Sequence, residues 1–137
     1  MEPIRKYFCE RDQLARHLGI ELTELSAGHA RARMTVQPMH MNGANVVHGG
    51  AIFSLADFAF AAASNSHGVL ALSISATISI MKAVTEGTLE AEAKEVALNP
   101  KLGTYLVTVT DPTGETIALF QGIVYRKKER VEDFVKE

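Results

Sequence analysis

The sequence has one cysteine, Cys9, among its 137 residues and no tryptophan. A single cysteine excludes a disulfide within the chain and is typical of proteins that work in a reducing compartment, so we expect a cytoplasmic protein. A chain of this length can bury a real core as one domain. We see no repeat, linker or low-complexity tract, and we therefore predict a single domain over residues 1–137.

The chain also lacks a surplus of charge, and its first residues do not form a hydrophobic run. Its net charge is −2, so it has none of the basic excess that marks nucleic-acid-binding domains. The segment from Met1 to Arg16 carries seven charged residues and is neither a secretory signal nor a membrane span. We expect no nucleic-acid partner and no membrane partner.

Motifs for metals and for common nucleophiles are missing too. The five histidines show no metal-ligand spacing and the lone cysteine adds no second ligand, so we expect no metal site. The sequence contains no nucleophile elbow around a serine and no phosphate-binding glycine loop. Whatever chemistry the protein performs must therefore use other residues.

What the sequence does contain is an apolar helix with one carboxylate inside it. Residues Ala51 to Ser66 are apolar on every helical face, which is typical of a buried helix, and about 16 residues are too few for a membrane span. Asp57 lies in the middle, and no lysine or arginine occurs between Arg33 and Lys82. A buried carboxylate without a partner is costly, so Asp57 must be neutralised, paired or functional.

Two glycines, Gly49 and Gly50, precede this helix. They place bare backbone where the first N–H groups of a helix have no partner, and such an end binds anions or polarises a carbonyl group. The stretch thus offers an electrophile stabiliser in these two amides and a base or nucleophile in Asp57.

The spacing between these groups predicts an assembly. Gly49 and Asp57 are eight positions apart, roughly 12 Å along a helix, which is too far for both to touch one reacting carbonyl. Two copies of the helix running antiparallel across a twofold axis would bring Gly49 of one chain near Asp57 of the other. We therefore predict a homodimer with composite sites.

The rest of the chain is predicted to form one more helix and six strands. Apolar spacing over Pro3 to Leu18 predicts an amphipathic helix that stops at Gly19. Strands are predicted over Glu21–Ser26, His29–Gln37, Leu70–Met81, Thr88–Leu98, Tyr105–Thr110 and Glu115–Arg126, followed by a charged tail from Arg126 to Glu137. Antiparallel strands with one buried helix predict an α+β fold whose curved sheet wraps around that helix.

Several polar residues near the helix are open to two interpretations. Asn42 either caps a turn in the loop from Pro38 to Val47 or serves the site. His48 is either catalytic or fixes the entrance of the helix. The strand over Leu70–Met81 is predicted to place its hydroxyls on one face, turned either to solvent or to the site; these are Ser73, Ser75, Thr77 and Ser79, opposite Leu72, Ile74, Ala76, Ile78 and Ile80.

The spacing Asn42-(x5)-His48-Gly49-Gly50-(x6)-Asp57, followed by an alanine-rich helix that ends Asn65-Ser66-x-Gly68, resembles the hotdog-fold acyl-CoA thioesterases of the phenylacetate-pathway type. The likeness extends from about residue 12 to residue 126. It implies a hotdog fold, hydrolysis of a small-molecule acyl-CoA, and dimers paired into a homotetramer with sites between subunits. It implies no cofactor, because CoA is part of the substrate.

The same resemblance implies roles for individual residues. The residue matching Asp57 acts as base or nucleophile, and the amide matching Gly49 donates to the thioester carbonyl. The residue matching Asn42 orients the water or the acyl group, and a strand hydroxyl, Ser73 or Ser75, assists.

Contacts to the rest of the substrate are expected from the helix entrance and from surface cations. The turn from Lys82 to Gly87 keeps the glycine of this family but lacks its proline. We expect Gly50 and Gly87 to contact the substrate. We expect the CoA phosphates to bind cations among Lys82, Arg126, Lys127 and Lys128. The phenylalanines of the helix suit an aryl or medium acyl group, or simply fill the core; these are Phe53, Phe58 and Phe60.

Two other functions remain open at this point. A hotdog hydratase or dehydratase uses a histidine with an acidic partner, whereas here the acid follows His48 at a thioesterase-like spacing. A non-catalytic acyl-CoA-binding module would be expected to carry a DNA-binding segment, for which this chain has neither the length nor the basic charge.

Overall fold

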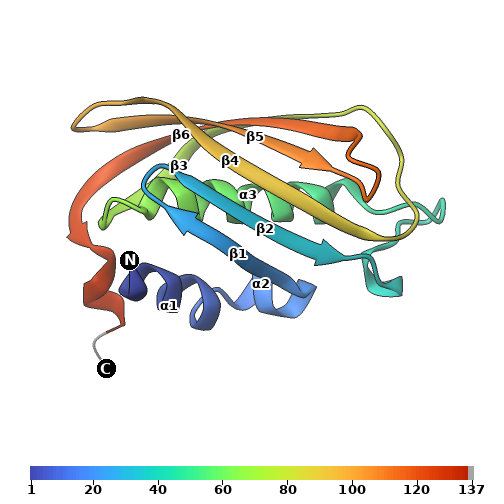
Figure 1. Cartoon of the computed structure of the whole chain (residues 1–137), viewed down its shortest axis with the longest axis horizontal. Coiled ribbons are helices and arrows are strands. Elements are labelled where there is room, and N and C mark those ends of the chain that lie inside the picture. The colour runs from blue at the N-terminus through green and yellow to red at the C-terminus, as the bar shows by residue number, and fades with distance from the viewer. Residues whose placement is uncertain (136–137) are drawn as a thin grey trace.

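The computed structural model describes residues 1–135 and shows an antiparallel sheet curved around a long helix (Figure 1). The elements in chain order are α1 (Glu2–Glu10), α2 (Gln13–Leu18), β1 (Ile20–Ser26), β2 (His29–Thr35), the 3-10 helix η1 (Pro38–His40), α3 (Gly49–Asn65), β3 (Val69–Ile80), β4 (Thr88–Leu98), β5 (Leu102–Thr110), β6 (Thr116–Arg130) and the 3-10 helix η2 (Val131–Phe134). The six strands lie in the order β1-β2-β4-β5-β6-β3. The predicted α+β class, with a sheet wrapped around a central helix, is confirmed.

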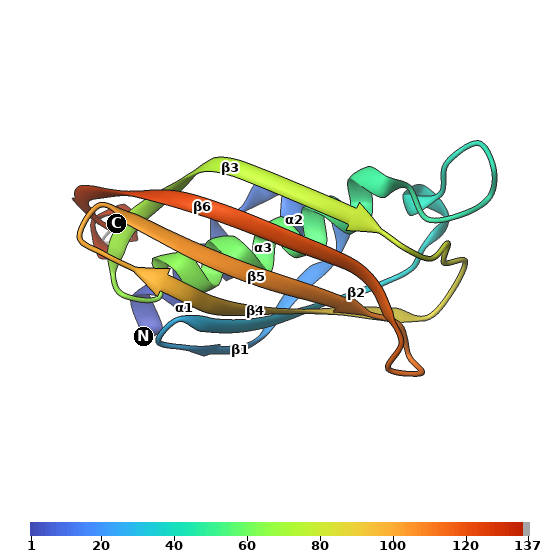
Figure 2. The ribbon, with the colours of Figure 1, turned by 90° about the horizontal axis from the view of Figure 1, so that it is seen from above.

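Small side chains let α3 lie close to the sheet. The inward faces of β2 and β4 carry buried alanines, namely Ala30, Ala32, Ala91 and Ala93. Larger rings fill the space beside β5 and β6, where the ring centroid of Phe60 is 5.8 Å from that of Tyr105 and 5.3 Å from that of Phe120. Each buried ring of this size contributes about 2 kcal/mol through removal of apolar surface from water. Figure 2 shows α3 running beneath the middle strands, with β3 and β1 at the two edges of the sheet.

Gly122 of β6 lies directly over the Phe60 ring. A Cβ at this position would be 2.5 Å from the ring, which is buried on all sides. We expect Gly122→Ala to lower the free energy of unfolding by about 1–3 kcal/mol, because the ring must leave its rotamer. Thermal or denaturant unfolding measures the loss. Gly43→Ala is the control, since a Cβ there meets nothing within 4 Å; equal stability of the two variants would contradict the packing described here.

The N-terminal segment differs from its prediction. Instead of one helix from Pro3 to Leu18, the chain forms α1 and α2, which are separated at Arg11 and Asp12. The carboxylate of Asp12 accepts a hydrogen bond from the N–H of Ala15 at 3.0 Å and so starts a new helix as its N-cap. The predicted stop at Gly19 is confirmed, because this residue ends α2 with a left-handed φ of 76°.

A bulge in β3 overturns the predicted division of that strand into one polar and one apolar face. Ser73 lies opposite Val124 of β6, Ser75 lies opposite Ile123, and Ile74 is the extra residue between them. Val124 is buried on the helix side of the sheet, so Ser73 is on that side as well. The outer face of β3 therefore holds Leu72 together with Ser75, Thr77 and Ser79.

Element ends differ by a few residues from the predictions. α3 begins at Gly49 rather than Ala51, and β6 continues past the predicted end at Arg126 to Arg130. The tail then forms η2, whose Phe134 contacts the ring of Tyr7 in α1 edge-on. Residues 136 and 137, the end of the predicted charged tail, lie outside the described residues.

The outer face of the sheet is divided into a charged half and an apolar half. On β1, β2 and β4, Arg31 lies 3.3 Å from Glu24 and 3.1 Å from Glu92, so charges there neutralise one another. The half formed by β5, β6 and β3 bears an exposed apolar patch, which consists of Leu72, Leu102, Leu106, Leu119 and Tyr125. A cluster of this kind is typical of a surface that another molecule covers.

Candidate active site

The N-terminus of α3 has one backbone amide without an acceptor. His48 is the N-cap, and its Nδ1 accepts the N–H of Gly50 at 2.8 Å. The N–H groups of Ala51 and Ile52 both donate to the carbonyl oxygen of His48. Within the described residues the N–H of Gly49 donates to nothing. Of the two glycines predicted to stabilise an electrophile, Gly49 is thus the one whose amide is available to a ligand.

The ring of His48 is held in place by the helix that it caps. Because Nδ1 accepts a hydrogen bond, the neutral ring carries its proton on Nε2. A Cβ on Gly50 would lie 3.0 Å from Nδ1, so glycine at this position leaves room for the ring. This geometry agrees with the interpretation that His48 fixes the helix entrance. A direct contact of His48 or Gly50 with the substrate stays a prediction.

Asn42 shapes the loop that leads to the helix. Its Oδ1 accepts hydrogen bonds from the N–H of Ala44 at 2.8 Å and from the N–H of Val46 at 3.3 Å. Its Nδ2 makes no hydrogen bond within the described part of the chain. The oxygen therefore serves the loop, while the two N–H donors of the side chain remain available to orient a water or an acyl group.

These two uses of Asn42 can be separated by substitution. Asn42→Asp and Asn42→Ser both keep an acceptor for the loop, and both remove the amide donor. If the donor serves the reaction, both variants should lose turnover by about tenfold or more while melting close to wild type. Asn42→Ala should lose turnover and also melt earlier. Full turnover in the aspartate and serine variants would assign Asn42 to the loop alone.

Asp57 lies on the one side of α3 that the sheet leaves uncovered. Gly50, Ser54, Asp57 and Ala61 recur there at helical spacing and are half-buried or exposed, whereas most of the helix is buried. The carboxylate of Asp57 makes no hydrogen bond or ion pair within residues 1–135. Burial raises the pKa of Asp57, and the negative charge of Asp12 raises it further. Asp57 is therefore an unpaired carboxylate with increased basicity, rather than a paired core residue.

The helix holds Gly49 and Asp57 apart. Both belong to α3, which runs without interruption from Gly49 to Asn65, so their eight-residue spacing corresponds to about 12 Å. One chain cannot bring both groups to one carbonyl. If both groups act in one reaction, this geometry requires a composite site between two chains. That composite site stays a prediction.

The strand hydroxyls predicted to assist lie on opposite faces of the sheet. Ser75 lines a shallow depression of about 340 Å³ on the outer face, together with Thr77 and Ser79. Ser73 is on the face that carries α3. Of the two candidates, Ser73 is the one on the same side of the sheet as Asp57.

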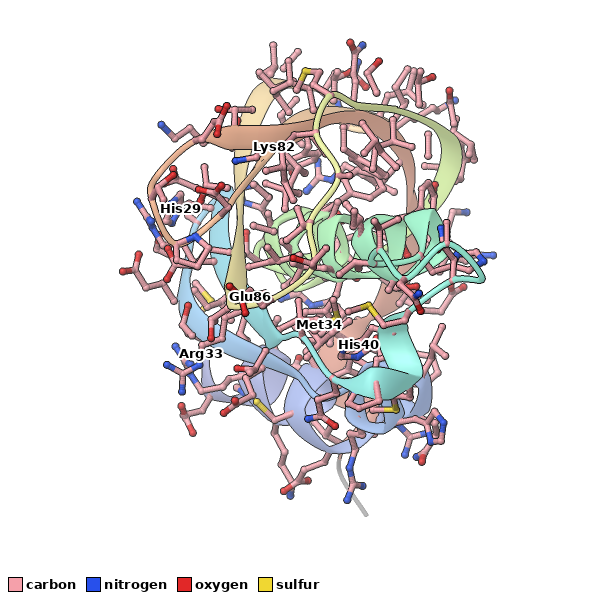
Figure 3. All side chains as sticks on the ribbon, turned by 90° about the vertical axis from the view of Figure 1, so that its right-hand side faces the viewer. His29, Arg33, Met34, His40, Lys82 and Glu86 are labelled. Carbon is pink, nitrogen blue, oxygen red and sulfur yellow. The ribbon has the colours of Figure 1, made fainter. Side chains whose placement is uncertain are left out.

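Lys82 and Gly87 belong to the connection between β3 and β4, and Figure 3, which labels Lys82, looks onto the end of the molecule where α3 begins. They line a cavity of about 520 Å³ between the β3–β4 and β5–β6 connections. The ammonium of Lys82 lies 2.9 Å from Asp111 and 2.5 Å from Glu115, and these hydrogen bonds raise the pKa of Lys82. Two carboxylates already neutralise this cation, which weakens it as a phosphate ligand.

Gly87 has a structural reason to be glycine. Its φ is 97°, and a Cβ there would lie 2.6 Å from the ring of Pro112 in the β5–β6 connection. Glycine at this position therefore lets Pro112 pack against the turn after β3.

Arg126 and its basic neighbours lie toward the other end of the sheet. The guanidinium of Arg126 donates to the carbonyl oxygen of Asn99 in the β4–β5 connection, which is at the left in Figure 1, whereas α3 begins at the right. Lys127 and Lys128 are exposed and make no ion pair within the described residues. Within one chain, these cations are therefore separated from Gly49 by the length of the helix.

Sequence reasoning missed the surroundings of Asp57. A cavity of about 220 Å³ beside it is lined by Asp12, Leu14, Ala15, Ile20, Phe53, Ser54, Asp57 and Phe58. The signal for Asp12 was its N-cap position, which the continuous amphipathic pattern over α1 and α2 obscured. Ser54 was visible as the polar residue one helical turn before Asp57.

Two negative findings concern the described residues. Residues 1–135 contain no group of three or more histidine, cysteine, aspartate or glutamate side chains arranged to hold a metal ion. In the same part of the chain, no helix is long and apolar enough to cross a membrane.

Comparison with known proteins identifies the family. Residues 44–118 match the family model of the thioesterase superfamily. A relative from Archaeoglobus fulgidus, provisionally described as an esterase, is 49% identical over 130 residues, which cover 94% of this chain and 84% of the relative. The acyl-coenzyme A thioesterase PaaI of Escherichia coli is 37% identical over 118 residues, covering 85% of this chain and 84% of that protein.

Solved structures give the same result. The structure of E. coli PaaI, from the phenylacetic acid degradation operon, superposes with a TM-score of 0.86 at 35% identity and covers 89% of each chain. A mutant of the phenylacetic acid degradation protein PaaI from Thermus thermophilus superposes with a TM-score of 0.82 at 34% identity, covering 85% of this chain and 100% of that one. The chain therefore belongs to the thioesterase superfamily and is a thioester hydrolase with a hotdog fold.

Proposed function

We propose that the protein hydrolyses acyl-CoA thioesters to a free carboxylic acid and CoA. One observation carries the proposal: within residues 1–135, the Gly49 amide of α3 has no acceptor and the Asp57 carboxylate has no partner. An unpaired donor at a helix start stabilises a developing oxyanion, and a carboxylate with raised basicity takes a proton from water. The E. coli relative, an acyl-coenzyme A thioesterase, supports the same reaction.

In the proposed mechanism the thioester carbonyl oxygen accepts the N–H of Gly49, and the field of the α3 N-terminus stabilises the oxyanion. Asp57 of the partner subunit removes a proton from a water molecule whose oxygen attacks the carbonyl carbon. The C–S bond then breaks, and CoA leaves as a thiolate that takes up a proton. In a second version Asp57 attacks directly and forms an anhydride that water hydrolyses. Neither version needs a cofactor.

The proposed assembly is a homodimer, paired further into a homotetramer. β3 is an edge strand whose residues from Leu72 to Ile80 are exposed or half-buried on both faces, so a second chain placed there would cover them. A twofold axis at this edge would run the two α3 helices antiparallel. The apolar patch on the outer face supports a second contact, between dimers.

The acyl group is proposed to be an aryl or medium acyl group. E. coli PaaI comes from a phenylacetic acid degradation operon. An aryl-CoA is therefore the first substrate to test. The first pathway to consider is phenylacetate degradation in the cytoplasm. For the CoA phosphates we propose Lys127 and Lys128, which are exposed, with Arg126 beside them. An antiparallel dimer would bring this end of one chain toward Gly49 of the other.

The direct experiment measures thiol release from a panel of acyl-CoA esters that includes phenylacetyl, short, medium and long acyl groups. We expect turnover on at least one aryl or medium acyl group. Enoyl-CoA hydration in place of thiol release would assign the chain to the hydratases, and tight acyl-CoA binding with neither reaction would make it a binding module.

A further inference from the structure

The cavity beside Asp57 contains a second carboxylate. Its volume is about 220 Å³, and it lies where α2 and β1 meet the uncovered side of α3. Asp12 and Asp57 are the two ionisable groups in its wall. The other six lining residues, from α2, β1 and α3, carry no charge; they are Leu14, Ala15, Ile20, Phe53, Ser54 and Phe58.

The position of the Asp12 side chain is fixed by its role as a helix cap. As the N-cap of α2 it has extended backbone angles, and its Oδ1 accepts the N–H of Ala15 at 3.0 Å. Ala15 is itself buried in the core, which anchors the start of the helix against α3. The hydrogen bond to Ala15 therefore restricts the Asp12 carboxylate to the start of α2, beside the cavity.

Within residues 1–135, the elements packed around Asp57 supply no charge that offsets this carboxylate. The inward faces of β2 and β4, which pack on α3, are apolar, and α1 contributes the ring of Phe8 against Phe58. Neither Asp12 nor Asp57 takes part in an ion pair within residues 1–135, and the nearby Arg16 donates to the carbonyl oxygen of Glu10 instead. Two like charges that share a mostly apolar cavity make the second ionisation unfavourable.

We propose that Asp12 is a positioning residue for the reaction: its carboxylate, held at the start of α2 in the wall of the cavity that it shares with Asp57, keeps Asp57 ready to accept a proton. This proposal rests on the proposed function, in which Asp57 is the base or nucleophile. The raised pKa of Asp57, caused first by burial and then by Asp12, points the same way. A general base works best when its pKa approaches the working pH, so Asp12 increases the rate without touching the substrate.

The test removes the charge of Asp12 and keeps its cap. Asn and Ser are N-cap residues comparable to Asp, so Asp12→Asn and Asp12→Ser should fold and melt close to wild type. Glu10→Gln is the matched control, because it removes one exposed negative charge from the same segment but does not line the cavity. Asp57 is titrated directly by carboxyl ¹³C NMR, with its signal assigned by its loss in Asp57→Asn, and the pH profile of kcat/KM is recorded for each variant.

We expect both Asp12 variants to move the Asp57 titration midpoint and the acid limb of the pH profile to lower pH. Their plateau rate should fall severalfold, since a weaker base accelerates proton removal less. Glu10→Gln should leave the titration and the profile unchanged. An Asp57 midpoint that stays in place in folded Asp12→Asn and Asp12→Ser protein would overturn the proposal.

The NMR titration does not depend on turnover, which separates this proposal from the proposed function. If the protein hydrolyses no acyl-CoA, the proposed function is contradicted, and so is the role of Asp12 in that reaction. If the enzyme is active but the Asp57 titration midpoint is the same in the Asp12 variants as in wild type, only the proposed role of Asp12 is contradicted.

Discussion

Replacing Asp57 by asparagine is expected to lower the rate of thioester hydrolysis by at least about 100-fold, the usual scale for loss of a general base. The substitution keeps the shape of the side chain and removes its charge, so it isolates the chemistry from the packing. Thiol release under saturating substrate measures the change. Gly50, Ser54 and Ala61 share the uncovered side of the helix with Asp57, and Ala61 does not line the cavity beside it, so Ala61→Ser provides a matched control for surface disturbance there.

The stability of the same variant separates two roles of Asp57. Because its folded pKa is raised above the ordinary value of 3.8, the native state holds more protons than the unfolded state between the two pKa values. This group therefore weakens the fold as pH rises through that window. Asp57→Asn should melt at the same temperature as wild type, or higher, at neutral pH. A clear drop in melting temperature with near-normal turnover would mean that Asp57 is a structural carboxylate.

The buried helix, the glycines at its start and the carboxylate in its middle could be predicted from the sequence because they depend on local pattern. An all-apolar helical stretch must be buried, and a carboxylate within it stands out. The start of the helix was less predictable, because its cap is His48 rather than the serine, threonine, aspartate or asparagine that usually occupies that position. Only the structure shows that this cap uses the amide of Gly50 and leaves that of Gly49 unpaired.

Features that depend on pairing between distant residues could not be predicted. The bulge at Ile74 leaves the alternating pattern of β3 intact in the sequence, yet it moves Ser73 and Ser75 to opposite faces. Lys82 meets its two carboxylates across 29 and 33 residues of chain, so its neutralisation is visible only in three dimensions. The break at Asp12 did have a local signal, but the amphipathic pattern on both sides favoured one helix.

The composite site can be tested by mixing two inactive chains. Asp57→Ala removes the carboxylate, and Gly49→Pro removes the amide donor. The structure favours this proline: Gly49 is the first residue of α3, where proline is tolerated, and His48 before it has φ −60° and ψ 135°, the conformation required ahead of proline. Gly49→Ala is the control, because it keeps the N–H and its Cβ would meet only the flexible tip of Ile80, at 3.3 Å. It should remain active.

In a heterodimer of Asp57→Ala and Gly49→Pro chains, one site carries both defects and the other carries neither. Random pairing gives about half mixed dimers, each with one intact site, so activity should return to about a quarter of wild type. Each variant alone must stay folded, oligomeric and inactive, and subunit exchange is followed by mass spectrometry. Recovery of about a quarter of the wild-type activity in the exchanged mixture is the result that the shared site predicts, whereas exchanged heterodimers with no activity would contradict it.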